Sequence, residues 1–309
     1  MNKYFNKYLP YIAGLTFSSI FGFSFMFTKE GLQLMKPFHL LGFRFGIAAL
    51  ALSILLILKV IKVDFKNKKM GLLALLAIVQ PGLYFVFETL GIEMTTSSEA
   101  GMMIALIPVF VTILAAVFLK EKPSLIQLPF IILSVAGVIF IVLMRDSSGQ
   151  TGKLLGIIYL LGAVIMAGIY NILSRKLSLS FKPLEITFIM MWSGAVFFNI
   201  MGFIKHSGGV LSYFSPITDI HVLGSVIYLG LLSSVVAFFM MNFTLSRIEA
   251  AQSAVFANLT TIVSILAGVF IRGESFYWYQ IVGGILIVIG VWGTNYYGKL
   301  KHKVEELPA

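Results

Sequence analysis

Residues 251–291 read AQSAVFANLTTIVSILAGVFIRGESFYWYQIVGGILIVIGV, and residues 98–138 carry the same pattern earlier in the chain, SEAGMMIALIPVFVTILAAVFLKEKPSLIQLPFIILSVAGV. In each stretch an uncharged run ends in a short polar break with a Glu, and a second apolar run follows. The pattern predicts a duplicated membrane hairpin, which is typical of secondary transporters. A shift of 153 positions pairs eight identical residues, namely Leu106 and Leu259, Glu121 and Glu274, Gln127 and Gln280, Ile132 and Ile285, Leu133 and Leu286, Val135 and Val288, Gly137 and Gly290, and Val138 and Val291.

The composition predicts an integral membrane protein. The 309 residues are 59% apolar and 12% charged, whereas soluble domains average roughly 45–50% and 25%. The net charge of +10 does not predict a nucleic-acid partner, because the cations lie in short loops, where they orient membrane proteins. The lack of cysteine excludes disulfides, thiolate catalysis and cysteine-ligated metals.

Hydropathy predicts an all-α membrane protein with ten transmembrane helices. A helix needs roughly 20 mostly apolar residues to cross the hydrocarbon of a lipid bilayer. The predicted spans are Leu9–Thr28, Pro37–Leu58, Gly71–Leu90, Glu99–Leu119, Pro123–Met144, Leu154–Ser174, Pro183–Ile204, Val222–Ser246, Ala250–Ile271 and Phe276–Tyr296.

The distribution of lysine and arginine predicts the orientation. With the N-terminus inside, sixteen of the 23 cations fall in the cytoplasm and six outside, while Arg44 lies within a span. The positive-inside rule therefore places both termini of this multi-pass chain in the cytoplasm of the cell membrane.

Ten spans in two copies give five spans per copy, and an odd number predicts that the second copy is inverted. Lys36 and Pro37 open the second span as Lys182 and Pro183 open the seventh, on opposite sides of the membrane. We expect a first repeat over residues 1–146, a second over 150–300, and a cytoplasmic tail over 301–309.

These residues resemble the EamA-domain group of the drug/metabolite transporter superfamily. The resemblance is carried by the repeated span that ends in Lys120–Glu121 and in Gly273–Glu274, and by the late Gly137 and Gly290 of the helices that follow. It covers nearly the whole chain. It implies ten helices, a central cavity between the repeats, and export or uptake of small metabolites or drugs.

Individual positions match the family unevenly. Pro108 matches its mid-span proline in the first repeat, whereas Thr261 replaces that proline in the second. Arg44 matches the family's arginine in span two. Phe130 stands where a glycine is usual early in the closing helix of the first repeat.

Two ionisable residues fall inside predicted spans. Arg44 and Glu88 both lie in the outer half, where a charged side chain costs several kcal/mol and indicates function by default. The long arginine could reach the carboxylate, so the pair contacts cargo or forms a structural ion pair.

Gln80, Tyr84 and Glu88 recur every fourth residue and therefore share one face of the third span. Pro81 is expected to kink this helix. We interpret the polar face as a cavity wall, and the alternative is a face bonded to neighbouring helices. Glu88 is also a candidate carrier of a coupling proton.

Weaker substrate-binding candidates are uncharged. Asn258 in the ninth span suits a zwitterionic or hydroxylated cargo, although a mid-membrane Asn equally joins helices. Tyr170, Asn171 and Trp192 are candidates of the same kind. Glu99, Glu121 and Glu274 stand at span N-termini, where a capping role is expected.

The sequence argues against an enzyme. It has no Walker or dinucleotide loop, no H-E-x-x-H and no G-x-S-x-G, and the four His residues are scattered, so we expect no cofactor, metal site or catalytic residue. The predicted function is a secondary transporter of small organic metabolites, amino acids or related polar solutes, with export favoured. The alternatives are a multidrug or hydrophobic-cation exporter, and a non-transporting membrane enzyme or scaffold. No pattern specifies an oligomeric state.

Overall fold

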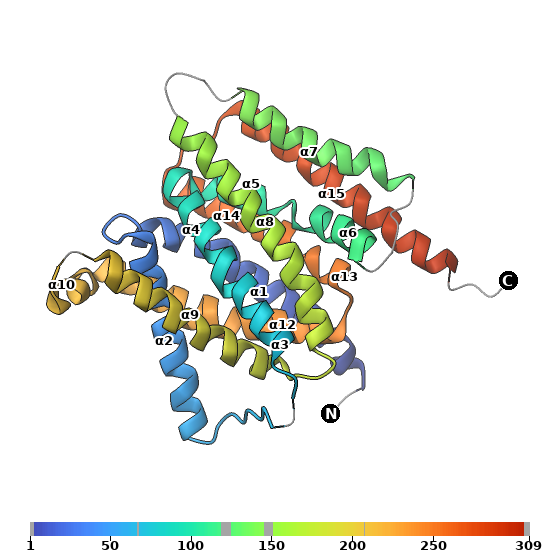
Figure 1. The fold of residues 1–309 in the computed structure, drawn as a ribbon. Coiled ribbons are helices and arrows are strands. Elements are labelled where there is room, and N and C mark those ends of the chain that lie inside the picture. Colours follow the sequence, from blue (N-terminus) through green and yellow to red (C-terminus); the bar gives the residue numbers. More distant parts are fainter. Residues whose placement is uncertain (1–2, 67, 119–124, 145–150, 207, 306–309) are drawn as a thin grey trace.

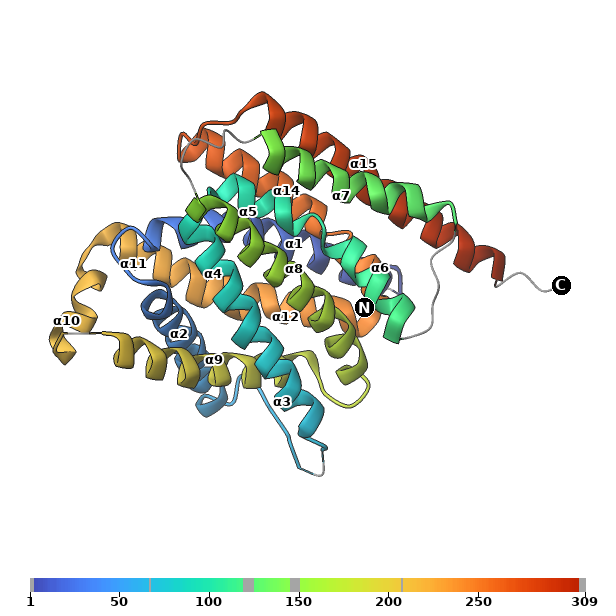
Figure 2. The same cartoon turned by 45° about the horizontal axis from the view of Figure 1, so that its top comes forward.

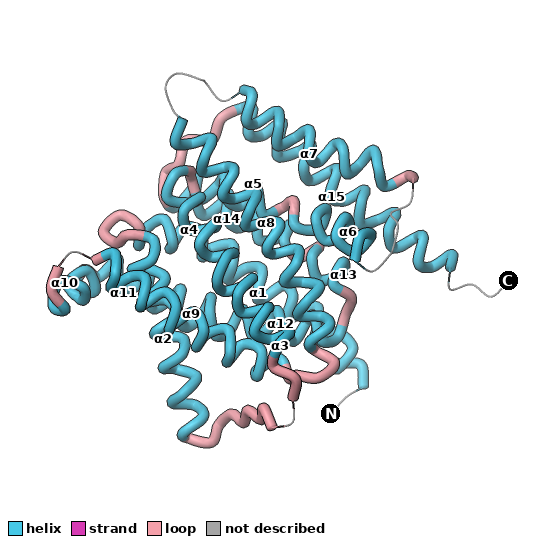
Figure 3. The backbone as a smooth tube through the Cα atoms, viewed as in Figure 1, coloured by secondary structure: helices cyan, strands magenta, loops and turns pink. Residues whose placement is uncertain are grey.

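The computed structural model describes residues 3–66, 68–118, 125–144, 151–206 and 208–305, and within them every regular element is helical (Figure 3). In chain order the elements are α1 (Lys3–Gly31), α2 (Pro37–Ile57), α3 (Gly71–Ala77), η1 (Ile78–Leu83), α4 (Tyr84–Met94), α5 (Ser97–Ile104), α6 (Ile107–Phe118), α7 (Gln127–Met144), α8 (Thr151–Leu177), α9 (Pro183–Lys205), α10 (Val210–Phe214), η2 (Ser215–Thr218), α11 (Ile220–Ile227), η3 (Tyr228–Ala237), α12 (Phe238–Arg247), α13 (Ala250–Ala254), α14 (Ala257–Leu266), η4 (Ala267–Ile271) and α15 (Trp278–Glu305).

The chain is a multi-pass membrane protein by the length and composition of its helices. In the described residues, eight helical stretches are long and apolar enough to cross a membrane. Two further apolar helices, Ala257–Ile271 and Trp278–Thr294, are shorter. α15 continues to Glu305, so the predicted tail is helical over residues 301–305, and its last four residues lie outside the described chain.

The fourth and ninth predicted spans are each interrupted by a tight turn. α5 ends before Ala105, and the amide of Leu106 donates to the carbonyl of Met103 at 3.0 Å. Pro108 helps to end α5 because it has no N–H to donate to the carbonyl of Ile104. The ninth span breaks after Ala254 without a proline. Hydropathy did not predict these interruptions, since both sides of each turn are apolar.

The third and eighth spans share a different irregularity. Each contains a π-helical segment, η1 in the third and η3 in the eighth. Within η1, Gln80 departs from helical geometry (φ −149°, ψ 116°), and Pro81 follows it. The expected kink at Pro81 is therefore present, and it turns α4 relative to α3.

Helices from the two halves of the chain pack against one another throughout the bundle. α2 lies along α9, α5 packs on α14, and α7 lies beside α15 as an outer layer (Figures 1 and 2). Glycines allow the last contact, because a Cβ at Gly137 would lie 2.7 Å from the carbonyl oxygen of Gly283, and one at Gly290 would lie 2.5 Å from that of Phe130. Gly137 and Gly290 therefore have a packing role between α7 and α15.

Candidate functional site

A cavity lies where the kinked and interrupted helices meet. Its empty space, including the opening, is about 620 Å³. Phenylalanines form much of its wall, and the polar lining comes from both halves of the chain. The aromatic lining is Phe17, Phe21, Phe25, Phe85 and Phe238, and the polar or charged lining is Ser24, Arg44, Gln80, Tyr84, Glu88, Asn171, Ser253 and Thr260.

Arg44 reaches the cavity from α2 and is almost fully buried, with 2% of its surface exposed. Its Nε donates to Ser234 Oγ at 3.0 Å and its Nη2 to Ser233 Oγ at 2.8 Å. The guanidinium also lies 4.3 Å from the centre of the Phe85 ring, within cation–π range. The serines and the ring therefore hold the cation in one position.

Glu88 is the acidic group of the same site. Its Oε2 lies 4.0 Å from Nη1 of Arg44, and its Oε1 accepts a hydrogen bond of 2.9 Å from the hydroxyl of Tyr84. Glu88 is 5% exposed, and its Oε2 has no hydrogen-bond partner in the described chain. A buried carboxylate oxygen without a donor is costly, so a ligand that donates a hydrogen bond would be stabilised here.

Two amide oxygens of the lining also lack a hydrogen-bond donor among the residues that the structure describes. Gln80 Oε1, at the kink of η1, and Asn171 Oδ1, on α8, are buried and lack partners within the described residues. The amide nitrogen of Asn171 is occupied, since it donates to the carbonyl of Ala167 at 2.8 Å. The lining therefore presents acceptors beside one cation.

The structure brings five of the eight residues predicted from sequence together at the cavity, and three lie elsewhere. Tyr170 is behind the wall, where its hydroxyl donates to Asn242 Oδ1 at 2.7 Å. Trp192 is 40% exposed, and its Nε1 donates to Ser53 Oγ at 3.1 Å on the side of α2. Asn258 follows the interruption of the ninth span and is not part of the lining.

Sequence reasoning missed the serines that position Arg44. Ser233 also accepts a hydrogen bond of 2.8 Å from Ser24 of α1, so three helices meet at its hydroxyl. One signal was available: the shift of 153 positions places Ser233 and Ser234 opposite Gln80 and Pro81.

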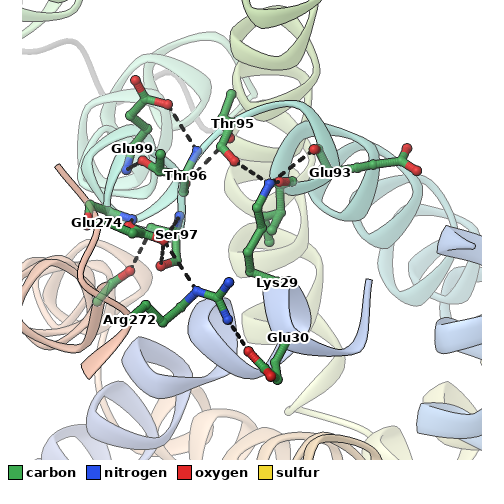
Figure 4. Close-up of polar contacts among 12 residues, drawn as sticks. Lys29, Glu30, Glu93, Thr95, Thr96, Ser97, Glu99, Arg272 and Glu274 are labelled. Atoms are coloured by element: carbon green, nitrogen blue, oxygen red, sulfur yellow. Dashed lines mark hydrogen bonds and ion pairs between the residues drawn. The ribbon is translucent and has the colours of Figure 1, made fainter. Parts of the chain in front are cut away.

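A second polar cluster surrounds the α4–α5 turn (Met94–Ser97) at one end of the bundle (Figure 4). Thr96 and Glu99 form a capping box at the start of α5, which confirms the predicted capping role of Glu99. Glu274 caps α5 of the other half rather than its own helix α15, so the expected target was wrong. Glu121 lies outside the described residues.

Four hydrogen bonds converge on the Glu274 carboxylate. The backbone amides of Ser97 and Ser98 donate at 3.0 Å each, and both hydroxyls donate as well. Burial alone would raise the pKa of this carboxyl, but the hydrogen bonds from Ser97 and Ser98 outweigh burial and hold the pKa below its ordinary value.

Comparison with known proteins identifies the family. The model of the EamA-like transporter family matches residues 9–143 and again residues 154–296. The chain belongs to the EamA-like transporter family. It is 38% identical over 301 residues to the uncharacterized transporter YcxC of Bacillus subtilis (strain 168), covering 97% of this chain and 96% of that protein.

Two further proteins resemble this EamA-like chain, one in sequence and one in fold. A probable terminal-alkyne amino-acid exporter of Streptantibioticus cattleyicolor is 25% identical over 231 residues, or 74% of each chain. A solved crystal structure shares the fold, with a TM-score of 0.69 over 96% of this chain and 98% of that chain at 16% identity. The family and its relatives identify a transporter.

Proposed function

We propose that this EamA-like transporter exports a small polar organic solute, an amino acid or a close relative, across the cell membrane by alternating access. In this proposal ten spans form two inverted five-helix repeats, residues 1–146 and 150–300, followed by a tail over 301–309. Both termini lie in the cytoplasm, and the cargo passes through the cavity between the repeats.

Matched contacts in the two halves support the inverted repeat. α1 packs on α14 and α12, and its counterpart α8 packs on α6 and α4. Lys29, eight residues before Pro37, donates to the carbonyl of Ile92 at 2.8 Å. Arg175, eight residues before Pro183, donates at 2.9 Å to the carbonyl of Leu245, which is the counterpart of Ile92 at the shift of 153.

The observation that carries the proposal is a buried cation 4.0 Å from a carboxylate whose other neighbours leave one oxygen without a donor. An α-amino acid complements both charges. Its ammonium can donate to Glu88 Oε2 and to Gln80 and Asn171, and its carboxylate can accept from the guanidinium of Arg44. The phenylalanines would surround an apolar side chain. The amino-acid exporter among the relatives supports the same class of cargo.

The second candidate function is export of a hydrophobic cation. Glu88 Oε2 accepts no hydrogen bond from the part of the chain that the structure describes, and this oxygen favours a cationic cargo, as do the aromatic walls, since aromatic faces attract cations. The nearby guanidinium of Arg44 opposes it, because a cationic cargo would approach a like charge that is fixed in place. This balance favours amino acids over hydrophobic cations as the proposed cargo.

Counterflow in proteoliposomes tests the proposal. Vesicles loaded with one unlabelled amino acid should accumulate the labelled amino acid, and a panel of amino acids and organic cations ranks the cargo classes. Measuring flux at two imposed pH gradients tests the coupling proton. Flux of organic cations alone would support the second candidate, and turnover of added lipid without flux of any solute would contradict transport.

Matched variants connect the flux to this cavity. Glu88→Gln removes the buried charge, and we expect amino-acid counterflow to fall at least tenfold. Glu93→Gln is the control, because Glu93 lies on the same helix with an exposed side chain. Equal flux in both variants would show that transport does not depend on the charge in this cavity. Proton-dependent flux that survives Glu88→Gln unchanged would remove the proton role.

A further inference from the structure

The two ends of the bundle are closed in different ways. At one end is the α4–α5 turn, and at the other is its counterpart, the α12–α13 turn (Arg247–Ala250). α1 ends and α15 begins at the α4–α5 end, so the first residues of α1 and the last residues of α15 lie toward the α12–α13 end.

At the α4–α5 end, charged side chains hold both helix termini of the turn (Figure 4). The ammonium of Lys29 donates to the carbonyls of Ile92, Glu93 and Thr95 at 2.8, 3.1 and 2.6 Å, where α4 presents its negative end. Glu274 accepts from the first amides of α5, the positive end of that helix. Opposite charges thus match opposite helix ends.

Arg272 joins these contacts to α1. Its guanidinium forms an ion pair with Glu30 of α1, and its Nε lies 3.7 Å from Glu274. Residues of α1 and of the segment before α15 therefore contact the same turn. All eight residues of α5, Ser97 to Ile104, are buried beneath them.

The α12–α13 end keeps Glu121, the counterpart of Glu274, in its sequence, but it lacks several of the other groups. The shift of 153 replaces Ser97 and Ser98 by Ala250 and Ala251, which have no hydroxyls, and replaces Arg272 by Leu119. At the N-cap, Thr96 is replaced by Glu249, which makes no side-chain capping bond. Lys176 follows Arg175 where Glu30 follows Lys29, so the acidic partner is lost as well.

The contact that does recur is the cation on the helix C-terminus, Arg175 to the carbonyl of Leu245. The α12–α13 end also has an ion pair between Lys68 and Glu185, but it joins the loop before α3 to the first turn of α9. The cavity approaches this end closely. Its lining includes Ser253, the fourth residue of α13, so it reaches within about 5 Å of the start of that helix at 1.5 Å per residue.

We propose that Glu274 and Arg272, with Glu30, form a latch that closes the cavity at the α4–α5 end, and that the resting carrier opens at the α12–α13 end, whose sequence lacks counterparts of Arg272 and Glu30. The inference rests on the proposed transport function, because it assigns the cavity as the solute path. Opening at the α4–α5 end requires Glu274 to leave the amides of α5. Transport then proceeds by making and breaking this latch once per cycle.

Cysteine accessibility tests the latch directly, because the natural chain contains no cysteine. Ala257→Cys places a single thiol in the cavity lining. A membrane-impermeant maleimide is applied to full-length protein in oriented vesicles, from the face carrying the termini or from the other face. We expect labelling from the terminal face and at least tenfold slower labelling from the other. Adding Glu274→Gln or Arg272→Gln should accelerate the slow reaction at least fivefold.

The control variants are Glu93→Gln, an exposed carboxylate at the same end, and Arg247→Gln, an exposed arginine at the opposite end. Both should leave the slow rate unchanged. Unchanged slow labelling in Glu274→Gln and Arg272→Gln, with terminal-face labelling intact as evidence of folding, would overturn the latch. Faster labelling of Ala257→Cys from the face opposite the termini than from the face carrying them would also overturn the latch.

The labelling assay uses no transported solute, so its outcome is separable from the proposed function. If the latch variants accelerate labelling while no solute shows counterflow, the latch stands and the transport proposal fails. If counterflow occurs while labelling stays unchanged, transport stands and the latch fails.

Discussion

The third and eighth spans occupy equivalent positions in the two halves and each contains a π-helical segment, but they contribute different polar groups to the cavity. Phe85 and its counterpart Phe238 both line the wall. Glu88, however, is replaced by Met241, and Gln80 and Pro81 by Ser233 and Ser234. The first copy thus presents an acid with one oxygen that accepts no hydrogen bond from the described residues, while the serines of the second copy hold Arg44.

This difference shows how a duplicated scaffold can acquire a polar site. A strictly symmetric cavity would place two like charges face to face, which costs free energy in a region of low dielectric. Here one copy keeps the acid, the other keeps neutral donors and acceptors, and a single arginine lies between them. In the proposed function, this asymmetry is what makes the cavity complementary to a solute with distinct charged ends.

The largest expected effect comes from making the copies alike. Glu88→Met gives the third span the residue of the eighth and leaves Arg44 buried without its acid. We expect a loss of about 3 kcal/mol in the free energy of unfolding and no measurable counterflow. Denaturation with SDS in mixed micelles measures the first quantity. Met241→Leu is the volume-matched control in the other copy. Retained flux in Glu88→Met would show that the acid is not part of the path.

The next effect concerns the anchor in the eighth span. Ser233→Ala removes the hydroxyl that bonds both Arg44 and Ser24. We expect a loss of about 2 kcal/mol, since one of these hydrogen bonds involves a charged group. Counterflow should weaken mainly through a higher KM, because the guanidinium is less well positioned. Ser225→Ala, at a buried serine of the same span, is the control. Equal effects of the two variants would contradict a specific anchor.

A smaller effect is expected at the helix ends, where the copies also differ. Glu274→Gln should lower the free energy of unfolding by about 1.5 kcal/mol at neutral pH. Because the folded pKa of Glu274 is depressed, its contribution is fully present above the unfolded carboxyl pKa of about 4.3 and is lost as pH falls through the lower folded value.

The difference between parent and Glu274→Gln should therefore stay constant from pH 7 to the ordinary carboxyl range and shrink below it. Equilibrium unfolding measured across this range checks the sign. The charged neighbours are Lys29, Glu30, Glu93, Glu99 and Arg272, and they are present in both proteins, so the difference isolates Glu274. If the difference in the free energy of unfolding instead grew as pH falls, the pKa of Glu274 would be raised by folding, which would contradict the expected direction.

The smallest effect tests the polar face of the third span. Tyr84→Phe removes one hydrogen bond of 2.9 Å to Glu88 and keeps the ring, so we expect a loss of about 1 kcal/mol. Tyr159→Phe is the control on α8. The free energy of unfolding in the same mixed micelles checks this value, and a cost for Tyr84→Phe as large as that of Glu88→Met would contradict the loss of a single hydrogen bond.

Hydropathy and periodicity predicted much of the helical architecture and part of the site. Gln80, Tyr84 and Glu88 were found because a repeat of four residues creates a face, and Arg44 because charge is rare in a span. Both signals are local in sequence. The turn after Ile104 was not predicted from Pro108 alone, since a proline also fits a helix that merely bends.

The remaining features depend on contacts between distant segments. A serine in a membrane helix usually bonds its own preceding turn, so nothing local marks Ser233 as the anchor of Arg44. Trp192 was chosen by residue type, but its orientation toward α2 follows from how α9 packs. Glu274 was expected to cap the helix that it precedes, and only the arrangement of the two halves shows that its partner is α5.

The contact between Glu274 and Ser97 also bears on how the protein is made. The two residues are separated by 177 positions, and a ribosome adds roughly 5 to 20 residues per second, so the N-terminal half waits on the order of 10 to 35 s for its partner. During that interval the leading amides of α5 lack the carboxylate that satisfies them in the finished molecule. A newly inserted first half is thus an incomplete assembly until the second half is made, and translation that stops between the halves leaves a fragment in which the first amides of α5 lack the Glu274 carboxylate.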